Sequence, residues 1–489
     1  MDEGASVQGT FLWHDYETFG TDPRRDRPVQ FAAIRTDANF NEVGDPIMLY
    51  CRQADDYIPH PEALLVTGIT PQDANRQGLC ESEFAERIQQ AMAEPGTCTL
   101  GYNSLRFDDE FSRNLFYRNF IDPYAREWQN GNSRWDLIDI VRATHALRPE
   151  GIVWPKSEDG TPSFRLEKLT EANGIEHGQA HDALADVRAT IALARLLKAR
   201  QPRLFEHLLG LRSKQAVKRL IDLDQHKPLL HVSGMLPARR GCATLVMPLA
   251  MHPTNPNGVI VYDLAQSPEQ WLDLDESALR QRVFSDNASL QAQGLERLPL
   301  KVVHVNRCPI LLPVKAVDDD VAERLSLDRA RCEQHWQQLR SVPDLVERVQ
   351  AVFSEPPAED HQGDPDLMIY GGGFFSSHDR QQMSAIRACD PALLSTLALP
   401  FQDQRLEEML FRFRARNWPE FLESDERERW DEWRWQRMND DQLSSLTLEG
   451  LQNRLMQLGH SGELDESQFF LMQELQAYVE SIVPTHLFY

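Results

Sequence analysis

The sequence predicts an α/β domain, then a small β-barrel domain, then a helical C-terminal domain. Three observations favour this fold class. Strand-like apolar runs alternate with helical patterns over residues 10–200, short apolar runs lie between Gly, Pro and Asn clusters over residues 229–313, and helical periodicity dominates from about residue 321. A chain of 489 residues is also too long for one ordinary hydrophobic core. We therefore expect three domains, at residues 1–200, 201–354 and 358–489.

The first domain carries the signals of a sheet with packed helices. Strand-like runs occupy residues 11–13, 30–34, 46–50 and 97–102. Helical spacing covers residues 83–93, 108–119 and 182–199. The last of these helices has the clearest apolar face, and Asp182 is its expected N-cap. Gln201-Pro202 ends that helix, so we place the domain boundary there.

The other two domains differ from the first in pattern. Short strands at residues 229–232, 243–246, 258–262 and 301–305 are typical of a small β-barrel. Residues 353–360 read as a linker rich in Pro and acidic residues. Beyond the linker the chain is mostly helical, and the spacing of Trp430, Trp433 and Trp435 in a helix is more typical of core packing than of ligand stacking.

The charge of the chain restricts its partners. A formal net charge of −24 argues, taken alone, against nucleic acid, because phosphate binding needs a basic surface. That surface need only be local, and residues 195–219 contain eight Lys or Arg and one acid. A solvated helix face explains the same run equally well.

The compartment is predicted to be the cytoplasm. No apolar run approaches the roughly 18 residues of a membrane span, and the acidic N-terminus lacks the features of a signal peptide. The seven scattered cysteines read as reduced thiols, neither a disulfide framework nor a zinc site. We expect no membrane partner and, because no coiled-coil seam is visible, a monomer.

Acidic residues at the end of the first strand supply the first chemical signal. Asp15 and Glu17 are two residues apart, so their side chains share one face of a strand. Two such carboxylates repel each other unless cations lie between them, and hard oxygen ligands suit Mg²⁺ or Mn²⁺. Two solvated acids at a strand end are the alternative.

Two further signals are weak when taken singly. Asp108 begins a helical pattern just after a strand-like run, where Asp is also common as an N-cap. His181 precedes Asp186 by five residues at the start of another helix. Ordinary cap and surface residues explain each of these, but the order of the three signals over about 170 residues of α/β pattern favours one site.

In this order the motifs resemble the DEDD exonucleases that carry a histidine before the last Asp, and more closely the bacterial exonuclease I family. The resemblance covers residues 11 to about 419. It rests on residues 14–20 (HDYETFG), 101–103 (GYN), 106–110 (RFDDE), 132–137 (NSRWDL), 162–167 (PSFRLE), 373–376 (GFFS) and 414–419 (RARNWP).

The resemblance implies a ribonuclease H-like exonuclease domain, an SH3-like β-barrel and a helical domain that together degrade single-stranded DNA processively from its 3′ end to 5′-mononucleotides, in DNA repair or recombination. It implies that two Mg²⁺ ions, for which Mn²⁺ may substitute, are held by Asp15, Glu17, Asp108 and Asp186. His181 is then the general base, and Glu17 also contacts the terminal 3′-hydroxyl.

The resemblance also implies binding residues. Arg165, Arg113 and Arg142 are expected to contact the DNA, and Tyr124 and Trp128 to stack on its bases, although Tyr124 and Trp128 could instead belong to the core. Single-stranded DNA-binding protein is the expected protein partner. Its acidic C-terminal tail is expected at Arg148 and Lys227, which could equally be solvated surface charges.

Three other functions compete. An RNA-degrading or proofreading DEDD exonuclease shares the chemistry, but the segments after residue 201 exceed a minimal RNase and no polymerase motif is visible. A non-catalytic nucleic-acid scaffold should lack a metal ligand, whereas all four carboxylates and the histidine are present. A glycosidase would use Asp15 and Glu17 but leave Asp108 and His181 without a role.

Overall fold

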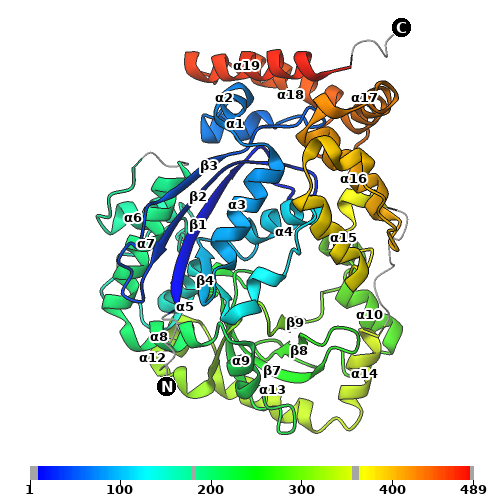
Figure 1. Ribbon diagram of the computed structural model, residues 1–489. Helices are drawn as coiled ribbons and strands as arrows, with labels where there is room; N and C mark the ends of the chain where they lie inside the picture. Colours follow the sequence, from blue (N-terminus) through cyan, green and yellow to red (C-terminus); the bar gives the residue numbers. More distant parts are fainter. Residues whose placement is uncertain (1–8, 179–181, 270, 355–362, 485–489) are drawn as a thin grey trace, which may run out of the picture. The chain divides into compact units, whose positions relative to one another are not determined.

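The computed structural model describes residues 9–178, 182–269, 271–354 and 363–484. The chain, whose helices and strands are labelled in Figure 1, divides into two compact units. Unit 1 comprises residues 1–133, 177–188 and 360–489, and unit 2 comprises residues 134–176 and 189–359. This division does not follow the three expected segments, whose bounds stay a prediction.

A five-stranded sheet has the strand order β3-β2-β1-β4-β5. Strands β1 and β2 are antiparallel, from Phe11 opposite Thr36 to Glu17 opposite Gln30, and β1 and β4 are parallel. The four predicted strand positions are confirmed, and β1 continues through the DxE motif. The bounds are β1 (Thr10–Thr18), β2 (Pro28–Thr36), β3 (Ile47–Tyr50), β4 (Thr97–Gly101) and β5 (Ser133–Asp136).

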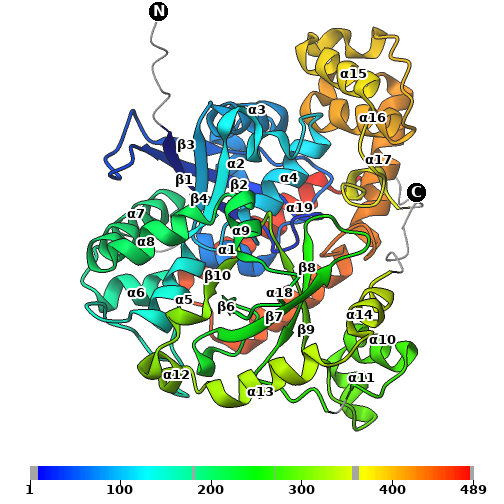
Figure 2. The same cartoon turned by 90° about the horizontal axis from the view of Figure 1, so that it is seen from below.

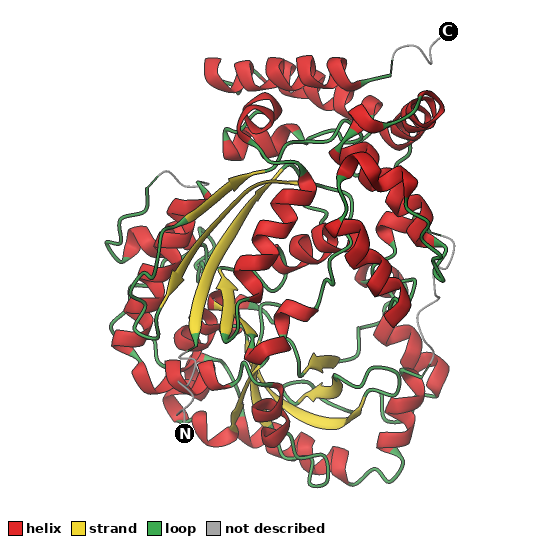
Figure 3. Cartoon of the chain, viewed as in Figure 1, coloured by secondary structure: helices red, strands yellow, loops and turns green. Residues whose placement is uncertain are grey.

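Two helices cover one face of this sheet, α3 (Glu81–Ala93) and α4 (Asp108–Arg118), as Figures 1 and 3 show. Their apolar side chains, including Phe84 and Leu115, pack on Leu12 and Phe31 of the strands in one buried cluster. Both helices were predicted. This packing fixes α4, and therefore the acidic residues in its first turn, against β1.

Later parts of the chain complete unit 1. The helices α1 and α2 share a hydrophobic cluster with α18 and α19, and Phe120 after α4 packs on Met383 and Phe413. Trp430 is buried against Phe411, which confirms the core packing predicted for it. The bounds are α1 (Pro61–Thr67), α2 (Pro71–Gln77), α15 (Ser377–Ala388), α16 (Arg405–Asn417), α17 (Ser424–Asn439), α18 (Leu448–Ser461) and α19 (Glu466–Ile482).

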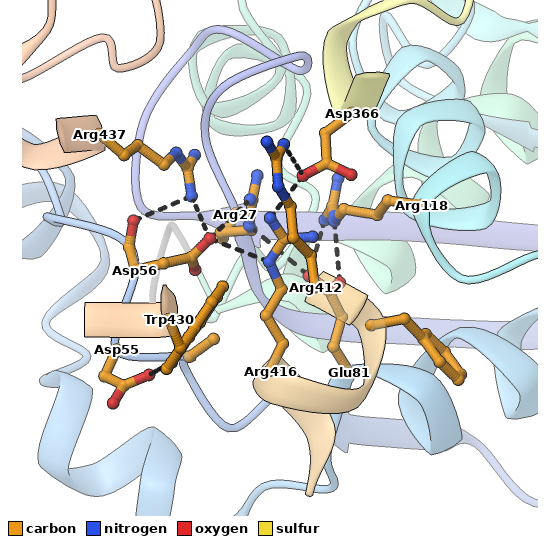
Figure 4. Close-up of polar contacts among 12 residues, drawn as sticks. Arg27, Asp55, Asp56, Glu81, Arg118, Asp366, Arg412, Arg416, Trp430 and Arg437 are labelled. Atoms are coloured by element: carbon orange, nitrogen blue, oxygen red, sulfur yellow. Dashed lines mark hydrogen bonds and ion pairs between the residues drawn. The ribbon is translucent and has the colours of Figure 1, made fainter. Parts of the chain in front are cut away.

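A buried arginine network links the early and late parts of unit 1 (Figure 4). Asp56 Oδ2 accepts from Arg416 Nε at 2.9 Å and Arg437 Nη1 at 2.8 Å. Asp366 accepts from Arg412 and Arg416, and Glu81 accepts two bonds of 2.8 Å from Arg118. The network consists of Arg27, Asp56, Glu81, Arg118, Asp366, Arg412, Arg416 and Arg437.

Unit 2 contains a second, antiparallel five-stranded sheet with the order β10-β6-β7-β8-β9 (Figure 2). The four predicted strands are present; β10 was not predicted separately. The bounds are β6 (Leu229–Val232), β7 (Ala243–Met251), β8 (Gly258–Asp263), β9 (Leu300–His304) and β10 (Ile310–Pro313).

Unit 2 also contains nine complete α-helices among its described residues. They are α5 (Leu137–Leu147), α6 (Leu166–Ala172), α8 (Pro202–Gly210), α9 (Lys214–Leu220), α10 (Glu276–Phe284), α11 (Asn287–Ala292), α12 (Asp319–Arg324), α13 (Arg329–Arg340) and α14 (Leu345–Val352). The helix α7 (Ala183–Arg200) begins in unit 1 and ends in unit 2. All seven cysteines are free thiols, as predicted. Among the described helices, none is long and apolar enough to cross a membrane.

Candidate metal centre

Three acidic side chains converge in unit 1. Asp15 and Glu17 project from one face of β1, and Asp186 lies in the first turn of α7. Each offers a carboxylate oxygen, and these oxygens all lie within 4.8 Å of one another. Glu17 is only 7% exposed, whereas Asp15 and Asp186 are partly accessible. The cluster is therefore compact enough to surround a cation and is open to solvent on one side.

Asp108 is the fourth acid near this cluster. It is the first residue of α4 and is 2% exposed, and its Oδ1 accepts a hydrogen bond of 3.0 Å from the backbone N–H of Tyr16. That bond ties α4 to the residue between Asp15 and Glu17. The N-cap position of the helix belongs to Phe107, so capping does not account for Asp108.

The electrostatics show that these acids crowd one another. Burial raises the pKa of Glu17 to about 8, with further contributions from Asp186, Asp108 and Asp182. Burial and the same kind of neighbours raise the pKa of Asp15 well above its ordinary value. No Lys or Arg of the described chain forms an ion pair with Asp15 or Glu17. A divalent cation would relieve this repulsion, and carboxylate oxygens are the ligands that Mg²⁺ prefers.

A histidine approaches the cluster. His177 Nε2 lies 2.6 Å from Asp186 Oδ1, an interaction that sequence reasoning missed because a histidine nine residues before an acid has no recognisable spacing. The predicted base, His181, falls outside the described residues. The neighbouring prediction that Asp182 caps α7 is supported, because its Oδ1 accepts from the backbone N–H of Leu184 at 3.0 Å.

The next acid on α4 is held differently. Asp109 accepts a bond of 2.6 Å from Arg126, and both side chains are buried. A guanidinium therefore neutralises Asp109, although it directly follows Asp108 in the chain. Sequence alone does not distinguish the two neighbouring acids, and the ion pair does.

Arg113 was predicted to contact DNA, yet its guanidinium already has carboxylate partners. It donates to both oxygens of Glu127, at 2.8 and 3.0 Å, and to Glu110 at 2.7 Å. It also lies 5.3 Å from the ring centroid of Tyr124. The DNA contact of Arg113 stays a prediction.

The two predicted stacking residues differ in exposure. Trp128 is 66% exposed, so it does not belong to the core, and Tyr124 is half-buried. The Tyr124 ring meets the ring of Phe374 edge-on at 5.9 Å. An aromatic surface is thus available in the same unit as the carboxylates.

The remaining predicted residues belong to unit 2, whereas the carboxylate cluster belongs to unit 1. Arg165 has a 73% exposed side chain, and Arg142 donates to Asp139 at 2.8 Å. Arg148 lines a cavity of about 600 Å³ together with Arg203, His207 and Lys315, over apolar side chains that include Leu204 and Leu312. Lys227 does not line that cavity and pairs with Asp222 at 2.8 Å.

Three family models together match most of the chain. The exonuclease family model matches residues 12–194, the exonuclease I SH3-like domain matches residues 212–355, and the exonuclease I C-terminal domain matches residues 363–482. The expected fold class is thereby confirmed: an α/β exonuclease domain, then an SH3-like domain, then a largely helical C-terminal domain.

Individual relatives are similar in sequence to this chain over nearly its full length. Exodeoxyribonuclease I of Escherichia coli K12 is 48% identical over 99% of this chain and 100% of its own, and that of Haemophilus influenzae is 46% identical over 96% and 98%. The structure of E. coli exonuclease I in complex with a dA16 oligonucleotide covers 97% of this chain and 100% of its own, with a TM-score of 0.93 and 48% identity. Exonuclease I of Methylocaldum szegediense covers the same shares, with a TM-score of 0.93 and 46% identity. The chain belongs to the exonuclease I family and is an exodeoxyribonuclease.

Proposed function

We propose that this enzyme removes nucleotides one at a time from the 3′ end of single-stranded DNA and depends on Mg²⁺. The observation that carries the proposal is the group of Asp15, Glu17 and Asp186, whose carboxylate oxygens lie within 4.8 Å of one another. Relatives crystallised with single-stranded oligonucleotides support the substrate.

The donor set fits a hard divalent cation. Asp15, Glu17, Asp108 and Asp186 would hold two Mg²⁺ ions, with Mn²⁺ as a substitute. When bound, the ions supply positive charge that stabilises the entering and leaving oxygens of the phosphodiester. A zinc-bound form of E. coli exonuclease I with single-stranded DNA has been solved, which supports metal binding by this family.

The protein's own groups complete the reaction. His181 accepts the proton of the attacking water, a role typically worth about 10²–10⁴ in rate. Glu17 contacts the terminal 3′-hydroxyl and so places the last phosphodiester at the carboxylates. The product is a 5′-mononucleotide, and the strand then advances by one nucleotide in processive fashion.

Substrate binding uses aromatic and basic groups. Trp128 and Tyr124 offer stacking surfaces that do not distinguish one base from another. Arg165 and Arg142 bind phosphates. Arg113, whose guanidinium lies 5.3 Å from the ring centroid of Tyr124, is proposed as a further DNA contact.

We also propose that the acidic tail of single-stranded DNA-binding protein binds the cavity that Arg148 lines. Its cationic rim and apolar floor suit a peptide with carboxylates and apolar side chains. A complex of single-stranded DNA-binding protein with exonuclease I has been solved for a relative. Lys227 would take part only from outside this cavity. We propose further that the enzyme is a cytoplasmic monomer that acts in DNA repair or recombination. Its domains are proposed at residues 1–200, 201–354 and 358–489.

The test uses a 5′-labelled single-stranded DNA oligomer and a matched RNA oligomer in Mg²⁺. We expect a ladder of shortened labelled DNA that disappears with EDTA and with Asp186→Asn, a variant that keeps side-chain size. Immediate release of a labelled mononucleotide would mean the opposite polarity. Faster loss of the RNA would favour the RNA-degrading alternative, and binding without cleavage would favour a scaffold.

A further inference from the structure

The last two helices of unit 1, α18 and α19, lie beside α1 and α2 (Figure 1). Side chains of both α18 and α19 line a groove of about 580 Å³. The lining positions of α18 begin at Leu448 and recur at i, i+3, i+4, i+7 and i+8. Those of α19 begin at Gln476, recur at i, i+3, i+4 and i+7, and end at Val483, its C-cap. Each helix therefore turns one face toward the groove, which we call the α18–α19 groove.

The floor of the groove is apolar and still reached by water. Leu451 and Val479 are buried, and they join the hydrophobic cluster that the two helices share with α1 and α2. Leu455 is partly buried, and Met456, which also lines the groove, is 55% exposed. Covering apolar surface that water still reaches is favourable, so the groove is suited to burial against a partner.

The two helical walls determine the shape of the occupant. Rows of side chains at three- and four-residue spacing form ridges, and a further helix packs between such ridges. From Leu448 to Met456 the rise of 1.5 Å per residue corresponds to about 12 Å, or roughly two helical turns. A helix that presents apolar side chains at i, i+3, i+4 and i+7 covers the same length, so the groove fits an amphipathic helix.

The charge around the groove restricts the partner. Residues 440–483 contain eight Asp or Glu, one Arg and no Lys. That arginine, Arg454, pairs with Glu62 of α1. Glu480 lines the groove, and its Oε1 accepts a hydrogen bond of 2.9 Å from Gln476 Nε2, but it has no ion pair in the part of the chain that the structure describes. This surface repels DNA, RNA and anionic lipids and attracts a basic polypeptide.

We propose that the α18–α19 groove docks a basic amphipathic helix of a partner protein. The apolar side chains of that helix pack on Leu451, Leu455 and Val479, and its Lys or Arg side chains face Glu480. The inference does not depend on the proposed function, because the groove contains none of the residues assigned to the metal or to DNA.

The probe is a fluorescently labelled peptide of about 18 residues with Leu along one helical face and Lys on the other. Its binding to the full-length enzyme is measured by fluorescence anisotropy, and we expect saturable binding that weakens as the salt concentration rises. Two peptides serve as controls. One has the same composition in an order that scatters the leucines around the helix, and the other has Glu in place of Lys. Both should bind at least about tenfold more weakly.

Two variants test the groove itself. Glu480→Lys reverses a charge in the groove, and Met456→Ser removes apolar surface from it, so each should weaken binding of the basic peptide about tenfold. Their matched controls, Glu463→Lys and Phe470→Ser, change exposed residues that do not line the groove and should bind the peptide as the wild-type enzyme does. All four side chains are exposed, so none of the changes should lower the melting temperature.

Three outcomes would overturn the proposal. Equal binding by test and control variants would show that the acidic surface attracts the peptide in general, without a docking site. Binding that appears only after residues 485–489 are deleted would make those residues the occupant. A wild-type dimer in sedimentation that Met456→Ser dissociates would assign the groove to a second copy of the chain.

Discussion

The metal centre and the arginine network are two clusters of acids in the same unit. The pKa values of their acids are shifted in opposite directions from the ordinary values. In the metal centre, burial and neighbouring carboxylates raise the pKa of Glu17 to about 8. In the network, burial alone would raise the pKa of Glu81, but Arg118 and Arg27 outweigh it and lower the value to about 2. Arg416, Arg437 and Arg27 likewise hold the pKa of Asp56 far below its ordinary value against the effect of burial.

The difference lies in the counter-charges that the chain itself supplies. Each network acid accepts hydrogen bonds from guanidinium groups, so its charge is compensated in the folded protein (Figure 4). Asp15 and Glu17 have no such partner among the described residues. Burial of an uncompensated acid costs free energy, and a site that bears this cost is suited to bind a cation from solution.

The largest expected effect follows from removing one charge at the metal centre. Asp15→Asn keeps the shape of the side chain but removes a ligand, so we expect kcat in Mg²⁺ to fall by about 10³-fold or more. Because the change also relieves repulsion, the metal-free melting temperature should stay level or rise. Activity assays and thermal melts in EDTA test both statements, and a strongly lowered melting temperature would mean that Asp15 has an internal partner.

The same substitution in the network should act in the opposite sense. Asp56→Asn leaves the buried charge of Arg437 without its carboxylate and leaves Arg416 with Asp366 alone, and breaking a buried pair typically costs about 3–5 kcal/mol. Urea unfolding in EDTA measures the loss. Glu83→Gln is the control, because its exposed pair with Arg87 on one helix is worth only about 0.3–0.5 kcal/mol. Equal losses in the two variants would remove the distinction between the clusters.

The two clusters also differ in how far the sequence predicted them. The acidic cluster could be predicted because strand alternation puts Asp15 and Glu17 on one face and because a helix start supplies Asp186. The network could not, since its members are scattered from Arg27 to Arg437 and meet only through tertiary packing. Arg113 shows the same limit: sequence gives its charge, but only the structure shows that Glu127 and Glu110 already neutralise it.

The smallest expected effect is the pH dependence of metal-free stability, where the two clusters should again differ in sign. Between its ordinary value of 4.5 and about 8, Glu17 holds a proton in the folded protein that the unfolded chain has lost. Its contribution to stability is therefore present below pH 4.5 and is lost as the pH rises towards 8.

Glu81 behaves in the opposite way, because its pKa is lowered from 4.5 to about 2. Its contribution is present above pH 4.5 and is lost as the pH falls towards 2. Urea unfolding in EDTA should give a decline in stability between pH 4.5 and 8 that Glu17→Gln reduces, because the uncharged amide does not titrate while Asp15, whose pKa is also raised, still does. Saturating Mg²⁺ should also remove the decline, since the bound cation compensates the carboxylates as guanidinium groups do in the network. A decline of the same size in Glu17→Gln and the wild-type enzyme would show that Glu17 does not contribute to this titration.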